Sequence, residues 1–195
     1  VNGEFVNNGS DHGYDVNGDG WTDVISNGWF DDQNIYWYEN PGESGEKWKK
    51  ELLIEAENVE FTLFEDVDGD GDPDIIPCHW YTDVPSDLVW YENKEGKFEK
   101  HMVASKAERH GIAIGDINGD GRKDIITVFG WFEAPEDYTS GDWKWHKELS
   151  IRSDAASLPM VVFDVNKDGK NDVIYGNAHA YGLYWMEQTE NGPWK

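Results

Sequence analysis

The chain has 195 residues, which is enough for one domain with a sizeable core. It carries 40 acidic and 16 basic residues, a formal net charge of −24. A surface of this sign repels the phosphates of nucleic acids and the head groups of anionic membranes, so it disfavours partners of either class.

A nine-residue acidic loop occurs four times along the chain, starting at Asp15, Asp66, Asp116 and Asp164. Oxygen-bearing side chains occupy positions 1, 3, 5 and 9 of each copy, and glycine occupies position 6. Carboxylate and amide oxygens at this spacing can wrap a hard cation, and the glycine permits the sharp turn. The pattern therefore predicts four structural Ca²⁺ sites.

The predicted ligands include the backbone carbonyl of position 7, which is Trp21, Asp72, Arg122 or Lys170. The complete sets are Asp15, Asn17, Asp19, Trp21 and Asp23; Asp66, Asp68, Asp70, Asp72 and Asp74; Asp116, Asn118, Asp120, Arg122 and Asp124; and Asp164, Asn166, Asp168, Lys170 and Asp172.

The loops belong to a larger repeat, because they recur after 51, 50 and 48 residues. A short apolar segment precedes each loop, and a β-branched pair follows it. A third segment then contains Trp37, Trp90, Trp131 or Trp185, and a fourth contains Trp48, Phe98, Trp145 or Trp194. Four short strands per repeat predict an antiparallel blade, and aromatic residues at recurring positions predict packing between blades. We therefore expect an all-β fold.

The motif Asp-x-Asn/Asp-x-Asp-Gly-x-x-Asp, flanked by strands and repeated about every 50 residues, resembles the FG-GAP repeat of integrin α-subunits. It is similar also to the VCBS-type repeats of secreted bacterial proteins, in which the Trp-Tyr-Glu-Asn-Pro strand (37–41) is typical. The resemblance implies a β-propeller of four-stranded blades with a Ca²⁺ loop between strands 1 and 2, usually closed by about seven blades. Residues 1–195 would then be a single propeller domain or a fragment of a larger propeller. A closed four-bladed ring is the alternative.

Connections between strands 2 and 3, and between successive blades, should share the end of the blades opposite the Ca²⁺ loops. Residues that do not repeat are concentrated there, and their aromatic rings and polar groups suit a sugar. The candidates for ligand binding are Trp29, Asp31, His79, Trp80, Tyr81, His110, His179 and Tyr181. Packing is the competing interpretation for the aromatic residues.

Other histidines and the single cysteine have simpler interpretations. His12 falls in a first strand and is expected to be structural, whereas His101 and His146 are expected at exposed edges. Cys78 is the only cysteine, so no intramolecular disulfide exists and a buried, inert thiol is expected.

Three functions remain open. The first is a Ca²⁺-stabilised binding or scaffold module for a glycan or an extracellular protein. The second is a polysaccharide lyase or glycosidase, with His79, Tyr81, Arg109, His110, His179 and Tyr181 as candidate catalytic residues. The third is a purely structural surface or matrix protein. Because such loops fill most easily at millimolar Ca²⁺, a secreted, periplasmic or cell-surface location is expected.

Overall fold

The computed structural model describes residues 8–29, 33–79, 86–108, 110–149, 151, 159–177, 181–190 and 194–195. Within these ranges, every sheet is antiparallel and its strands pair in chain order. Three sheets have four strands and the last has three, which confirms the predicted all-β repeat.

The first sheet contains β1 (Asn8–Tyr14), β2 (Asp23–Gly28), β3 (Ile35–Glu39) and β4 (Lys49–Ile54), with the short 3₁₀ helix η1 (Gly42–Ser44) before β4. The second contains β5 (Val59–Glu65), β6 (Asp74–His79), β7 (Ser86–Lys94) and β8 (Lys97–Glu108). The third contains β9 (Ile112–Gly115), β10 (Asp124–Thr127), β11 (Gly130–Glu133) and β12 (Lys144–His146). The fourth contains β13 (Val161–Phe163), β14 (Asp172–Gly176) and β15 (Leu183–Met186).

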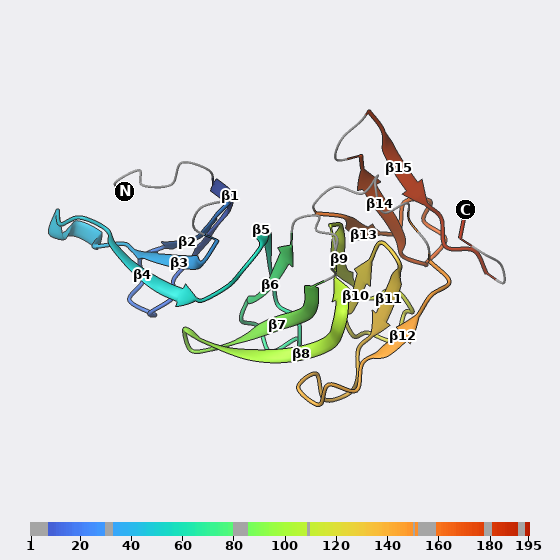
Figure 1. Cartoon of the computed structure of the whole chain (residues 1–195), viewed down its shortest axis with the longest axis horizontal. Helices are drawn as coiled ribbons and strands as arrows, with labels where there is room; N and C mark the ends of the chain where they lie inside the picture. The colour runs from blue at the N-terminus through green and yellow to red at the C-terminus, as the bar shows by residue number, and fades with distance from the viewer. Residues whose placement is uncertain are drawn as a thin grey trace.

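The four sheets follow one another in an arc, with the first and the fourth at opposite ends (Figure 1). The arc is open between these ends, so the structure differs from the closed four-bladed ring considered above. No helix in the described part of the chain has the length and apolarity needed to cross a bilayer.

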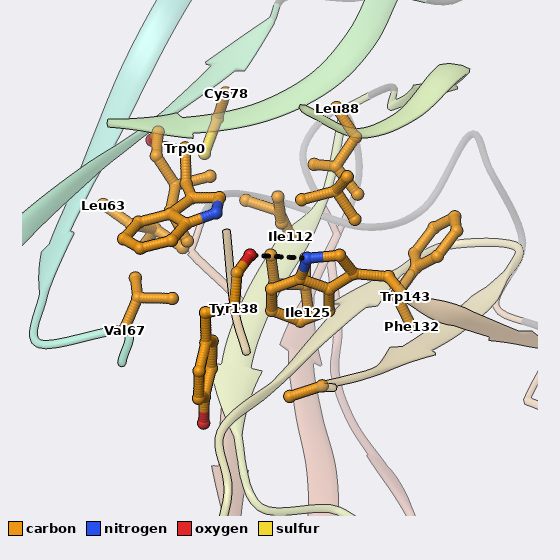
Figure 2. Close-up of a cluster of buried hydrophobic side chains, with 13 residues drawn as sticks. Leu63, Val67, Cys78, Leu88, Trp90, Ile112, Ile125, Phe132, Tyr138 and Trp143 are labelled. Atoms are coloured by element: carbon orange, nitrogen blue, oxygen red, sulfur yellow. Dashed lines mark hydrogen bonds between the residues drawn. The ribbon is translucent and has the colours of Figure 1, made fainter. Parts of the chain in front are cut away.

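Apolar side chains fill the spaces between successive sheets in three clusters. Ile25 and Ile35 of the first sheet meet Ile75 of the second, and Trp131 of the third sheet shares a cluster with Val173 of the fourth. The middle cluster joins the second and third sheets and includes Cys78, whose thiol is buried as predicted (Figure 2). Burial of apolar area between neighbouring sheets therefore holds the repeats together.

Trp90 and Trp131 of the recurring third-strand tryptophans pack between sheets as predicted, and Trp37 is partly buried against the first cluster. Trp90 is fully buried and Trp131 is 6% exposed, whereas Trp185, on the last sheet, is 43% exposed. The buried pair thus contributes to the cores between sheets.

The fourth-strand position needs a correction in the third repeat. Glu39 pairs with Lys49, Glu92 with Glu99 and Glu133 with Lys144, so the residue before each of these fourth-strand partners is Trp48, Phe98 and Trp143. Trp143 is buried in the middle cluster, whereas Trp145, the residue predicted for this position, is 43% exposed.

The last repeat has the beginning of a fourth strand. Glu187 and Lys195 exchange two backbone hydrogen bonds, of 2.8 and 3.1 Å. This pairing gives Trp194 the same repeat position as Trp48, Phe98 and Trp143, as predicted.

Candidate metal centre

Each acidic loop joins the first two strands of its sheet and ends on a fully buried aspartate at position 9. These residues, Asp23, Asp74, Asp124 and Asp172, are all 0% exposed. One carboxylate oxygen accepts the backbone N–H of loop position 2 at 2.7–3.1 Å. The other oxygen accepts the N–H of the residue that follows Glu39, Glu92, Glu133 or Glu187, at 2.7–2.9 Å. The aspartate therefore ties the start of its loop to the third strand.

Carboxylates and amides at positions 1, 3 and 5 are turned inward by the loop's own backbone. In the first loop, Asp15 accepts the N–H groups of Asp19 and Gly20 at 3.0 and 2.8 Å. The side chain of position 3 accepts the N–H of position 5 in all four loops, at 2.9–3.1 Å. Position 5 accepts the N–H of position 7 at 2.8–3.0 Å. The four loops therefore share one conformation.

Two positions of the loop require a left-handed backbone. Glycine at position 6 has φ between +89° and +100° in all four copies, as the sequence predicted. Position 4 also has positive φ: it is glycine in the first three loops but Lys167, at +64°, in the fourth. The fourth loop therefore carries a side chain where the conformation favours glycine.

The second loop has the densest group of acidic oxygen atoms. Ligand atoms of Asp66, Asp68 and Asp74 all lie within 4.8 Å of one another. Burial raises the pKa of Asp74 to about 7 and that of Asp124 in the third loop to about 6, because the charged form loses hydration. A hard cation would supply the missing counter-charge, so these residues fit Ca²⁺.

At the opposite end of the blades, the predicted residue His110 meets a carboxylate that is not among the predicted candidates. His110 is only 8% exposed, and its Nε2 lies 3.0 Å from Glu60 Oε2. His79 is half-buried at the end of β6 and lines a cavity between the first and second sheets. Trp29 is half-buried, and Tyr181 is fully exposed. The other candidates, Asp31, Trp80, Tyr81, Arg109 and His179, lie outside the described residues.

The remaining histidines contact aromatic rings. His12 stacks on Phe64 at 5.2 Å between ring centroids, and burial lowers its pKa, in agreement with a structural role. His101 and His146 are not the exposed edge residues that the sequence predicted. His101 packs on Trp90 at 4.9 Å and His146 stacks on Trp131 at 4.1 Å, and their side chains are 11% and 18% exposed.

A third-strand glutamate explains why both histidines turn inward. The Nε2 of His101 lies 2.7 Å from Glu92, and that of His146 lies 2.6 Å from Glu133. Hydrogen bonds from Lys144 and His146 lower the pKa of Glu133. Glu92, Glu99 and His101 group closely enough to hold a metal, but Lys94 contacts both of these carboxylates at 3.0 and 2.7 Å. The ammonium group therefore already offsets part of their charge.

Successive antiparallel sheets pack against one another, and each has an acidic loop between its first two strands. This arrangement defines a repeat protein with propeller-type blades. A model of the FG-GAP-like repeat matches residues 15–77 and 66–127. These matches span more than half of the chain, which belongs to the FG-GAP-like repeat family. The fourth loop lies outside the matched residues but has the same hydrogen bonds. No curated protein matches the chain.

Proposed function

We propose that the protein is a Ca²⁺-stabilised extracellular scaffold that binds a carbohydrate or a protein partner. The observation that carries the metal part is the convergence of Asp66, Asp68 and Asp74 in a loop conformation repeated four times. Bound Ca²⁺ would neutralise these carboxylates and, by binding only the folded chain, stabilise it. The position 7 carbonyls of Trp21, Asp72, Arg122 and Lys170 remain predicted ligands.

The same chemistry supports the proposal of an extracellular location. Loops with this ligand set work best where Ca²⁺ is millimolar, which favours a secreted, periplasmic or cell-surface protein. Bound cations would also reduce the large negative charge that otherwise opposes compactness.

A cavity of about 610 Å³ supports the binding part of the proposal. The cavity lies between the second sheet and the segment that connects β4 to β5. Its walls include His79, Asp87, Tyr91 and Lys100. The connecting segment contributes Glu57 and Asn58. A partly apolar wall beside several hydrogen-bonding groups suits the ring and hydroxyls of a sugar, so a glycan is the preferred ligand.

The test is to incubate the Ca²⁺-loaded protein with neutral and acidic polysaccharides and to measure both retention and released sugars. We expect retention without products, and weaker retention by His79→Ala and Lys100→Met. The exposed Lys147 lies outside the cavity lining, so Lys147→Met serves as the charge-matched control.

The same experiment distinguishes the alternatives. The appearance of new unsaturated or reducing ends would show that the protein is a polysaccharide-degrading enzyme and not a binding module. Neither retention nor products would refute glycan binding, and retention on a protein matrix would then favour a protein partner. Inertness in both assays would favour a structural role.

A further inference from the structure

The side chain at loop position 8 reaches back to the preceding loop in the third and fourth repeats. Lys123 Nζ donates a hydrogen bond to the backbone carbonyl of Asp66, which is position 1 of the second loop. Asn171 Nδ2 donates to the carbonyl of Asp116, position 1 of the third loop, at 2.6 Å. Two residues at the same repeat position thus make the same contact, 57 and 55 residues away in the sequence.

The donor of the third repeat is held by the packing between sheets. The backbone N–H of Lys123 donates to the hydroxyl of Tyr138 at 3.0 Å. Tyr138 belongs to the middle cluster, where Trp143 Nε1 donates to its carbonyl at 3.3 Å (Figure 2). In the last repeat, Gln188 Nε2 adds a 2.9 Å bond to the carbonyl of Ile117, position 2 of the third loop. The contacts therefore join ordered parts of neighbouring sheets.

The charge of the donor differs with the number of carboxylates in the loop that it touches. The second loop has aspartate at positions 1, 3, 5 and 9, and the donor that reaches it is the cationic Lys123. The third loop has the neutral Asn118 at position 3, and its donor is the neutral amide of Asn171.

Each donor also directly precedes the buried aspartate that ends its own loop. Lys123 is followed by Asp124 and Asn171 by Asp172. Movement of the donor therefore moves a predicted ligand of its own loop, while its hydrogen bond fixes position 1 of the preceding one. The second repeat differs, because its position 8 is Pro73, whose side chain has no donor.

We propose that Lys123 and Asn171 couple Ca²⁺ binding between adjacent loops, the second with the third and the third with the fourth. This inference rests on the proposed Ca²⁺ sites. Closing one loop fixes the carbonyl that receives the donor, and the held donor positions the last ligand of the next loop. By linkage, Ca²⁺ in either loop of a pair then raises the affinity of the other by the same factor.

The test follows the backbone amide signals of Gly71, Gly121 and Gly169, one in each loop, by ¹H–¹⁵N NMR during a Ca²⁺ titration of the full chain. Asp120→Ala, which removes a ligand of the third loop, is expected to raise the Ca²⁺ midpoint of Gly71 about fivefold, at the lower end of ordinary coupling. In a Lys123→Met background this shift should largely disappear, and Lys123→Gln, which keeps a donor, should retain part of it.

Two controls make the result specific. Lys147→Met removes a lysine charge elsewhere and should leave the Gly71 shift intact. Asn171→Leu should leave the response of Gly71 to Asp120→Ala intact, while weakening the response of Gly169 to that substitution, because the Gln188 bond to Ile117 remains. A Gly71 midpoint unmoved by Asp120→Ala, or moved equally in the Lys123→Met background, would overturn the coupling. If the glycine signals ignored Ca²⁺ altogether, the proposed Ca²⁺ sites themselves would fail.

Discussion

Replacing the buried aspartate of the third loop should destabilise the protein even without metal. Asp124 is 0% exposed and accepts the backbone N–H groups of Ile117 and Ala134, each at 2.9 Å. Asp124→Ala leaves both donors buried without this acceptor, at a cost of about 1–3 kcal/mol each. Removing a buried charge offsets part of that cost, so a net loss of about 2–4 kcal/mol is expected.

Asp120→Ala is the matched control, because it removes a carboxylate from the exposed side of the same loop. Its ion pair with Arg122 is partly exposed and should contribute about 0–1 kcal/mol. Both variants are compared by urea unfolding at pH 7, in excess chelator and in millimolar Ca²⁺. In chelator, only Asp124→Ala should unfold at clearly lower urea, whereas Ca²⁺ should reveal a loss in both. Equal midpoints for the two variants in chelator would refute the structural role of Asp124.

Three further predictions follow from burial and backbone conformation. Burial raises the pKa of Asp74 to about 7 when folded, above its ordinary value of 3.8, so the folded metal-free protein binds more protons than the unfolded chain. Protonation of this group should therefore stabilise the metal-free protein as pH falls from about 7 towards 4. The Ca²⁺ affinity should fall over the same range, because binding needs the ionised form. A Ca²⁺ affinity that is equal at pH 8 and 5.5 in calorimetry would contradict this. Lys167→Gly should stabilise the protein by about 1 kcal/mol by relieving the left-handed residue, and a lower urea midpoint would argue against strain there. Trp143→Ala should cost about 3–5 kcal/mol and Trp145→Ala about 1 kcal/mol or less, because only the first is buried; the reverse order in urea unfolding would restore the position predicted from sequence.

The repeat made the strand order and the acidic loops predictable. Four copies of one loop, each between apolar segments, leave little freedom in how the chain pairs, and all four sheets follow the expected order. The sequence could not distinguish Trp143 from Trp145 as the buried residue, since two residues that are two positions apart fall on the same face of an alternating strand. Only the pairing of Glu133 with Lys144 shows which tryptophan takes the buried position.

Other features of the site depend on contacts that a linear pattern does not contain. The sequence marked Asp124 as a ligand, but its bond to Ala134 depends on how the third strand returns. The inward turn of His101 and His146 similarly depends on the tryptophan and glutamate opposite them. Glycine at position 4 in three loops was a signal available in the sequence, whereas the contact of Lys123 with Asp66 required the structure.

The central claim is that the acidic loops bind Ca²⁺ and thereby stabilise the fold. The most direct measurement is the thermal unfolding of the full chain in excess chelator and in millimolar Ca²⁺, with binding followed in parallel by isothermal titration calorimetry. We predict a sharply higher melting temperature with Ca²⁺, since one site at 100 times its dissociation constant contributes about 2.7 kcal/mol and further filled sites add to this. The predicted stoichiometry is one ion per loop. An unchanged melting temperature together with no binding heat would contradict the account.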